Sequence, residues 1–150
     1  MINCKFENGN KASLRHVTID VLVLKGHKVL LVKRTGKLLE TGKWGVVGGF
    51  VERNETLTEA ASREVYEETG WKIKNIKLLR IIDWPDRPKD DRQNISFVYF
   101  ADAFKKTGSP DNESSEQKWF DLDRLPPQET FAFDHFQDIE FYLKNLPSYC

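Results

Sequence analysis

Cysteine is scarce in this 150-residue sequence: Cys4 and Cys150 stand at opposite ends of the chain and form no CxxC pair. That spacing argues against a disulfide framework and against a cysteine-based metal site. The sequence also lacks net charge, because 23 lysines and arginines balance 23 aspartates and glutamates. A balanced chain has no general attraction for nucleic acid or for an anionic membrane, and we expect neither as a partner.

Long apolar runs are absent as well. No stretch is long enough to cross a membrane, and the first residues, MINCKFENGNK, contain no apolar signal core. We therefore expect a cytoplasmic protein whose mature chain begins at Met1. Hydrophobic residues make up 39% of the chain and charged residues 31%, without repeats or linkers. Residues 1–150 are accordingly expected to form one domain with one core.

Apolar periodicity predicts several strands and two helices. Strands are expected at residues 14–25, 29–34, 44–52, 71–83, 94–104 and 117–122, and helices between Thr56 and Gly70 and over 133–146. Thr56 with Glu59 forms a capping box, and Gly70 is a helix stop. Two helices far apart in the chain fit an α/β (α+β) sandwich, with a central mixed sheet flanked by helices. Three aromatic residues near the last helix are expected in the core: Phe133, Phe136 and Tyr142.

The first helix ends in a cluster of carboxylates, within the sequence REVYEETG of residues 63–70. Glu64 and Glu68 are four residues apart, so their charges repel, and the helix dipole disfavours anions at this end. At about 100° per residue, Glu64, Glu67 and Glu68 fall beside the apolar stripe rather than opposite it. That stripe consists of Leu57, Ala61 and Val65.

One interpretation of this cluster is a charged helix surface, partly neutralised by Arg63. Another is a metal site, because carboxylates that face inward must be paired or must bind a cation. Oxygen ligands alone suit a hard divalent ion such as Mg²⁺ or Mn²⁺. A bound cation would remove the repulsion, and the position beside the apolar stripe favours this second interpretation.

The wider spacing resembles the Nudix box, the signature of the Nudix hydrolases. From Gly49, five residues lead to Glu55, seven more lead to Arg63-Glu64-Val65, and Glu67-Glu68 and Gly70 follow. Seven specified residues at fixed spacing should occur by chance in about one window in a hundred million. The resemblance implies a Nudix fold, a mixed sheet between helices, and a loop–helix–loop around the box.

The resemblance also implies roles for the box residues. Metal-binding groups would be the side chains of Glu64, Glu67 and Glu68, with the carbonyl of Gly48. Arg63 would brace the loop through Glu55, and both would orient the ligands. The pair Gly48-Gly49 would let the backbone approach the ion and the substrate closely. Two positions depart from the common surroundings of the box, because Val47 stands where the family often has proline and Asn54 where it often has glycine.

Such a box supports hydrolysis of a nucleoside diphosphate linked to another group, NDP–X, to NMP and P–X. The metal, Mg²⁺ with Mn²⁺ as the alternative, would neutralise the diphosphate and activate a water. A general base must take the proton of that water. A box glutamate could do so, as could Glu113 or Glu116 in the loop SPDNESSEQKW. A merely solvated acidic loop is the alternative for both.

Three short stretches resemble ADP-ribose and nucleotide-sugar pyrophosphatases of this family. They are GGFVE at 48–52, DWPDRPKDDRQNISFVYFA at 83–101 and FAFDH at 131–135. The proline associated with ADP-ribose specificity would be Pro85 or Pro88. ADP-ribose or a nucleotide sugar is therefore the expected substrate, and the resemblance also implies a homodimer.

Further substrate contacts are suggested by side-chain chemistry. Arg15 and Arg34, at the ends of the first two strands, could clamp phosphate, with surface cations as the alternative. Trp44 and Trp84 could stack on a base, or pack in the core or on the surface. Arg87, in the charged turn, is another candidate, with a solvated cation as the alternative.

Three other functions stay open. A nucleoside triphosphate pyrophosphohydrolase, including one for damaged nucleotides, belongs to the same reaction class. A non-catalytic nucleotide-binding domain is disfavoured because the box keeps all its carboxylates and the chain ends soon after the last helix. Hydrolysis of RNA caps or 5′-triphosphates is disfavoured by the neutral charge.

Overall fold

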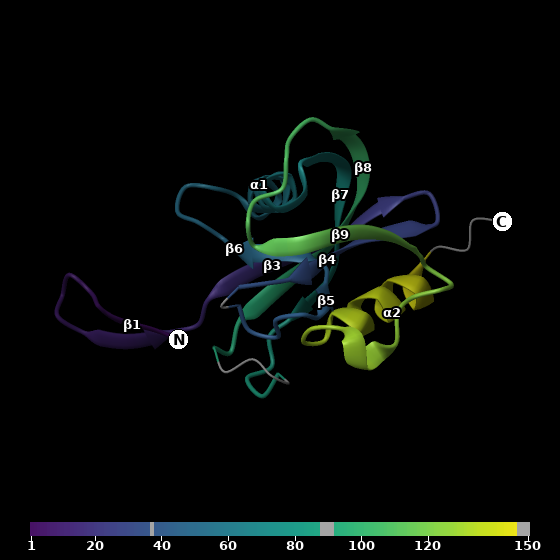
Figure 1. Ribbon diagram of the computed structural model, residues 1–150. Helices are drawn as coiled ribbons and strands as arrows, with labels where there is room; N and C mark the ends of the chain where they lie inside the picture. The colour runs from purple at the N-terminus through teal and green to yellow at the C-terminus, as the bar shows by residue number, and fades with distance from the viewer. Residues whose placement is uncertain (37, 88–91, 147–150) are drawn as a thin grey trace.

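The computed structural model describes residues 1–36, 38–87 and 92–146 (Figure 1). In chain order the elements are β1 (Ile2–Lys5), β2 (Lys11–Leu14), β3 (Val17–Lys25), β4 (Lys28–Arg34), β5 (Trp44–Gly45), β6 (Val47–Phe50), α1 (Leu57–Thr69), β7 (Trp71–Ile82), β8 (Ile95–Lys106), β9 (Ser114–Asp121), a 3-10 turn (Gln128–Thr130) and α2 (His135–Asn145). None of the helices described there is long and apolar enough to cross a membrane.

Seven strands form one mixed sheet. Its main path runs β5-β4-β3-β8-β7, while β6 pairs with β3 and β9 pairs with β4. The β3–β8 pair is parallel and the other pairs are antiparallel. Helix α1 lies on one side of the sheet and α2 on the other (Figure 1). The predicted sandwich of a mixed sheet between helices is therefore confirmed.

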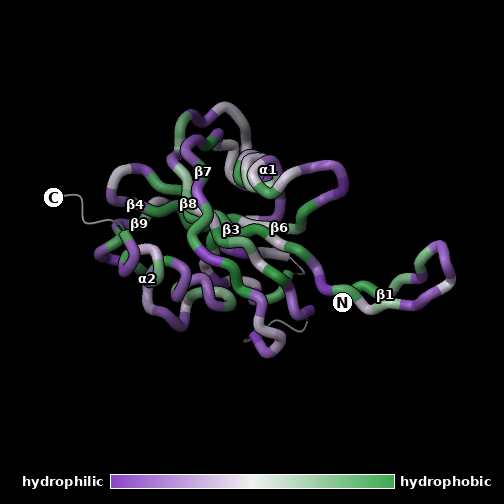
Figure 2. The backbone as a smooth tube through the Cα atoms, turned by 180° about the vertical axis from the view of Figure 1, so that it is seen from behind, coloured by the Kyte–Doolittle hydropathy of each residue, from purple (hydrophilic) through white to green (hydrophobic). Residues whose placement is uncertain are grey.

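Strand β3 supplies both layers of the core. Residues that alternate along it point to opposite faces, so a strand covered on both faces is apolar throughout. Ile19 and Val21 pack in the layer beneath α1, with Val65. Leu22 packs in the layer beneath α2, with Ile139. Figure 2 shows the apolar residues concentrated in these central strands.

One edge of β3 is shared between two partners. Its last residues, Leu24 and Lys25, pair with β4. Its first residues pair with β6, so that Asp20 faces Gly48 and Ile19 faces Gly49. The strands β4 and β6 therefore diverge along β3, and this divergence places the glycine pair beside the start of the central strand.

Helix α1 has the predicted ends. The hydroxyl of Thr56 accepts a hydrogen bond from the N–H of Glu59, and the Glu59 carboxylate accepts from the N–H of Thr56. At the other end Gly70 has φ +75° and donates its N–H to the carbonyl of Tyr66. Gly70 also accepts hydrogen bonds from the N–H groups of Thr107 and Gly108, which ties the loop after β8 to the end of α1.

The sequence analysis missed the first two strands. β1 and β2 form a separate antiparallel hairpin, and Figures 1 and 2 show it extending away from the sheet. A hairpin signal was present, because Asn8-Gly9 is a favoured turn pair and Gly9 has φ +87°. The flanking residues are largely polar, which hid the strands from an apolar pattern.

Gly70→Ala is expected to destabilise the fold by more than about 2 kcal/mol in urea unfolding. An added Cβ would suffer the strain of a positive φ and would also collide with the carbonyl oxygen of Gly108. Gly26→Ala is the matched control, because Gly26 has φ +58° but nothing lies within 4 Å of its added Cβ. It should lose only about 1 kcal/mol. Equal losses in the two variants would show that the collision is relieved at no cost.

Candidate active site

A pocket of about 570 Å³ opens between α1, the divergent strands and the start of α2. This volume lies within the ~300–1,000 Å³ of typical small-molecule sites. An acidic wall is formed by Glu52, Glu64, Glu67, Glu68, Asp111 and Glu113. Other lining residues include Asp20, Arg34, Leu38, Leu39, Val46, Gly48, Gly49, Phe50, Arg63, Arg87, Arg92, Phe133 and His135.

The three glutamates near the C-terminal end of α1, Glu64, Glu67 and Glu68, differ in exposure. Glu68 is 6% exposed, and its Oε1 accepts a hydrogen bond of 3.2 Å from the N–H of Gly48. Burial, with the charges of nearby carboxylates, raises the pKa of Glu68 well above its ordinary value. Burial also raises the pKa of Glu64. Glu67 is exposed at the rim. The inner two carboxylates therefore stand in an environment that opposes their negative charge.

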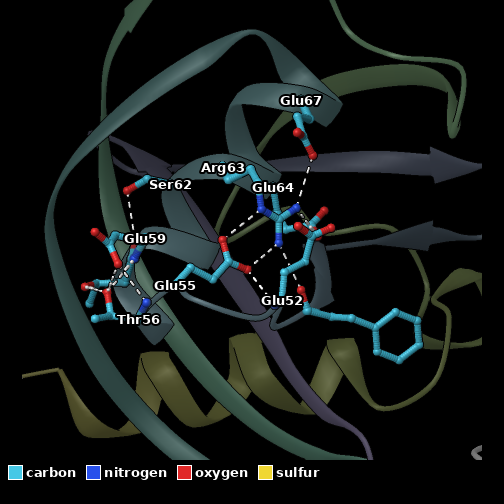
Figure 3. A network of polar contacts seen from close by, with 10 residues as sticks. Glu52, Glu55, Thr56, Glu59, Ser62, Arg63, Glu64 and Glu67 are labelled. Carbon is cyan, nitrogen blue, oxygen red and sulfur yellow. Dashed lines mark hydrogen bonds and ion pairs between the residues drawn. The ribbon is translucent and has the colours of Figure 1, made fainter.

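Arg63 joins the helix to the preceding loop (Figure 3). Its guanidinium donates to both oxygens of Glu55, at 3.0 and 2.7 Å. The same group donates to Glu64 at 2.8 Å, to Glu67 at 3.2 Å and to the carbonyl of Phe50 at 3.0 Å. The contact expected between Arg63 and Glu55 is present, and it fixes the box loop against α1.

The backbone at Gly48 and Gly49 lies so close to neighbouring atoms that a side chain would not fit. A Cβ on Gly49 would fall on the carboxylate of Glu64, and a Cβ on Gly48 would fall on the carbonyl of Ile19. Glycine at position 48 therefore allows the close approach of β6 to β3, and glycine at position 49 allows the Glu64 carboxylate to lie against β6. Asn54, where the family often has glycine, has φ +71°, a conformation that asparagine tolerates better than most residues.

The donor set on α1 suits a divalent cation. Glu64, Glu67 and Glu68 offer hard oxygen ligands, and a cation would relieve both their repulsion and the cost of burying them. Among the described residues, no three His, Cys, Asp or Glu side chains converge closely enough to hold an ion as they stand. Here Arg63 lies between Glu64 and Glu67 and bonds to both.

The loop after β8 brings Glu113 to the acidic wall. The N–H of Asp111 donates to the carbonyl of Glu67 at 2.9 Å, and the Asp111 side chain accepts from the N–H of Glu113. Glu116 lies on β9, is exposed and does not line the pocket. The structure thus brings one of the two predicted base candidates to the site. It adds Asp111, which the sequence analysis did not identify.

Residues 14–139 match the family model described as NUDIX domain. The chain belongs to the Nudix family of hydrolases. The match begins at the last residue of β2, so the rest of the β1–β2 hairpin lies outside the matched part of this Nudix chain.

Relatives and solved structures agree with this assignment. The Nudix chain is 37% identical to the ADP-ribose pyrophosphatase of Methanocaldococcus jannaschii, over 85% of this chain and 73% of that protein. It is 31% identical to the NAD-capped RNA hydrolase NudC of Actinobacillus succinogenes, over 77% of this chain but 45% of NudC. The Nudix domain of Shewanella oneidensis NrtR complexed with ADP ribose superposes with a TM-score of 0.75 at 27% identity, covering 91% of each chain.

Of the predicted substrate contacts in the Nudix chain, Arg34 lines the pocket. Its Nε donates to the carbonyl of Leu39 at 2.8 Å, and its guanidinium lies 5.1 Å from the ring centre of Phe133. Burial lowers the pKa of Arg34, and the neighbouring carboxylates, with Glu68 and Asp20 foremost, oppose that effect.

Three other predicted contacts do not line the pocket. Arg15 donates to the carbonyls of Asp83 and Gln93, both at 2.5 Å, and so ties the two ends of the charged turn together. Trp44 packs edge-on against Phe120, and Trp84 is 49% exposed. The prediction that these side chains contact substrate is therefore not supported by their positions. Pro85 is exposed, and Pro88 lies outside the described residues.

Arg87 lines the pocket but is 6% exposed, so the alternative of a solvated cation is wrong. Its guanidinium forms a bidentate ion pair with Asp134, at 2.8 and 2.6 Å, and lies 3.8 Å from Asp20. This pairing fixes the charged turn against the start of α2. Arg87 therefore builds the pocket wall with a guanidinium that is already engaged by carboxylates.

A polar network forms the floor of the pocket. Burial alone would raise the pKa of Asp20. The pKa is nevertheless lowered to about 2 by His135, Arg87 and Ser96, which favour the ionised carboxylate. The Nδ1 atom of His135 accepts a hydrogen bond of 3.2 Å from the N–H of Val46, and Nε2 faces Asp20. The sequence analysis missed Asp20 and His135. An aspartate inside the apolar run VTIDVLVLK was the available signal, since buried carboxylates need partners.

Gly49→Ala is expected to weaken Mn²⁺ binding at least ten-fold in calorimetric titration, with little change in melting temperature. The new Cβ meets the flexible end of Glu64, which can move at small cost but then leaves its position. Gly48→Ala is the contrasting variant, because its Cβ meets the backbone carbonyl of Ile19 and should lower stability instead. Unchanged Mn²⁺ affinity in Gly49→Ala would contradict the ligand role of Glu64.

Proposed function

We propose that this Nudix hydrolase cleaves NDP–X to NMP and P–X, with ADP-ribose or a nucleotide sugar as its substrate. The observation that carries the proposal is one pocket that combines the α1 carboxylates, of which Glu68 is buried, with the guanidinium of Arg34. A cation-binding wall and a facing arginine suit a diphosphate, whose charge needs both. The relative named ADP-ribose pyrophosphatase supports this choice of substrate.

Glu64, Glu67 and Glu68 would hold the divalent cation, Mg²⁺ or alternatively Mn²⁺. The cation supplies charge neutralisation for the diphosphate and lowers the pKa of a bound water. The chain keeps these ligands in place: Arg63 fixes Glu64 and Glu67, and the N–H of Gly48 fixes Glu68. Arg34 binds a phosphate oxygen from the opposite wall and holds the anhydride in position for in-line attack.

Glu113 is the general base in this proposal. Its loop is bonded to the carbonyls of Glu67 and Gly70, so the backbone that carries Glu113 keeps a fixed position relative to the box. Asp111 orients the loop by accepting the N–H of Glu113. Glu113 accepts the proton of the attacking water, while the cleaved phosphate leaves as P–X.

NAD is a second candidate substrate, because it is also an NDP–X with a central diphosphate. It is favoured by the relatives named NAD-capped RNA hydrolase, although the chain spans less than half of the NudC quoted above. A cytoplasmic location and a homodimer stay predictions from the sequence.

A substrate panel tests the proposed function. With Mg²⁺, chromatography should detect AMP and ribose 5-phosphate from ADP-ribose, and the panel should include ADP-glucose, NAD and the common and oxidised nucleoside triphosphates. Glu67→Gln is the inactive control, because Glu67 is exposed and its loss removes a ligand but little packing. A fall in kcat of at least about 10²-fold, ~3 kcal/mol, is expected for it.

Two results of this panel would contradict the proposal. Turnover of triphosphates alone would replace the NDP–X substrate with a nucleoside triphosphate. Tight binding of ADP-ribose without turnover in Mg²⁺ or Mn²⁺ would instead indicate a non-catalytic nucleotide-binding domain.

Glu113→Gln is expected to lower kcat by about 10²–10⁴-fold with little change in KM, because it removes the proton acceptor. The remaining rate should rise at alkaline pH, where hydroxide replaces the base. Glu116→Gln is the matched control, since it makes the same change a few residues away and outside the pocket. Equal rates for the Glu113 variant and the wild type would assign the base to a box glutamate.

A further inference from the structure

Phe133 has an unusual backbone conformation for an aromatic residue. Its φ is +49°, and it is the only aromatic among the non-glycine residues with positive φ in the described part of the chain. For a bulky L residue this conformation costs about 1–2 kcal/mol and persists only where its surroundings enforce it. Phe133 was expected in the core, but it precedes α2, is half-buried and lines the pocket.

The residues on both sides of Phe133 are fixed by hydrogen bonds. The N–H of Ala132 donates to the carbonyl of Trp44 at 2.8 Å. Asp134 is held by both donors of Arg87, and the ring of His135 accepts the N–H of Val46. With both neighbours fixed, the chain cannot relax the strain at residue 133 without breaking these bonds. The fold therefore holds the Phe133 ring at the pocket against a local energetic preference.

The ring of Phe133 stands beside the expected phosphate contact. The Arg34 guanidinium lies 5.1 Å from its centroid, and Arg34 interacts electrostatically with Glu68, Asp20 and Glu113. Arg34 thus connects the aromatic ring with the carboxylate wall. The pocket lining also includes the apolar residues Leu38, Leu39 and Val46, and the Leu39 carbonyl accepts a hydrogen bond from Arg34.

We propose that the nucleobase of the substrate stacks in the apolar end of the pocket against the Arg34–Phe133 pair. The proposal rests on the proposed function, in which the α1 carboxylates and Arg34 hold the diphosphate from opposite walls. The nucleoside attached to the phosphate at Arg34 then reaches the adjacent ring. Stacking on aromatic and guanidinium planes accepts any nucleobase, because every base has a π-face. The X group points away from Arg34.

A second aromatic residue of the pocket is less suited to this role. Phe50 is 42% exposed, and its ring is approached by the His16 ring at 5.0 Å and by the Arg92 guanidinium at 5.6 Å. Phe133 has similar neighbours, the Arg34 guanidinium at 5.1 Å and the His135 ring at 5.6 Å, so exposure and backbone constraint distinguish the two residues. Phe133 is less exposed to solvent than Phe50, and a base gains more by stacking on a less exposed ring. The backbone of Phe133 is also held in place before a ligand binds.

The test compares ligands with and without a base. In Mg²⁺, dissociation constants for AMP, GMP, CMP, UMP and ribose 5-phosphate are measured by calorimetry. Phe133→Leu should weaken the mononucleotide that wild type binds best by about ten-fold, in keeping with the loss of one stacked ring. Binding of ribose 5-phosphate should be unchanged, and Phe133→Tyr should restore the wild-type affinity.

Two further variants separate stacking from folding. In Phe133→Gly the new glycine adopts a positive φ without strain, so the melting temperature of the variant should fall little. The variant should nevertheless bind mononucleotides as weakly as Phe133→Leu does. Phe104→Leu is the matched aromatic control, because Phe104 is 60% exposed and lies outside the pocket. It should leave all affinities unchanged.

Three results of the binding measurements would overturn the stacking proposal. In Phe133→Leu these are an equal loss of affinity for the mononucleotide and for ribose 5-phosphate, or no loss for either. The third is a wild-type protein that binds no mononucleotide. The proposed function fails separately. If wild type binds a mononucleotide in a Phe133-dependent way but hydrolyses no NDP–X, the stacking site stands and the hydrolysis does not. Normal turnover of ADP-ribose with an unchanged KM in Phe133→Leu refutes the stacking alone.

Discussion

The site depends on the hydrogen bonds by which Arg63 joins the carboxylates of α1 to the loop between β6 and α1. Alone, these carboxylates would repel one another at the helix end where anions are least favoured. Arg63 offsets part of that repulsion, and its bidentate bond to Glu55 fixes the loop after β6, the strand whose Gly48 N–H donates to Glu68. The α1 carboxylates that we propose as metal ligands, the loop after β6 and the helix are therefore held together by the bonds of Arg63.

Much of the fold could be predicted from local signals. The capping box at Thr56 and the stop at Gly70 bound α1 because both act within a few residues of the chain. Six strand segments of the sheet were recognised from their apolar residues, but the strand expected over 44–52 is two strands, β5 paired with β4 and β6 paired with β3. The β1–β2 hairpin was missed because it packs on no apolar face, and only its Asn8-Gly9 turn marked it.

The site was predictable where its residues are close in sequence and less so elsewhere. The box carboxylates and their brace follow from one helix and its loop. The rest of the pocket depends on tertiary contacts, which the sequence does not show. Arg15, for example, donates hydrogen bonds to the carbonyls of Asp83 and Gln93 and does not line the pocket. Phe133 looked like a core residue because hydropathy cannot show that its backbone turns before α2. Asp20 was hidden because its partners lie far away in sequence.

The divergence of β4 and β6 along β3 has a consequence for how this scaffold can change. Strand β4 ends at Arg34, for which we propose phosphate binding, and β6 carries the glycine pair. The segment that joins β4 to β6 contains β5 and includes Leu38 and Leu39, which line the pocket. Its length and sequence therefore act as an adjustable spacer, through which evolution or design can resize the cavity for a different leaving group while the hydrolytic machinery stays intact.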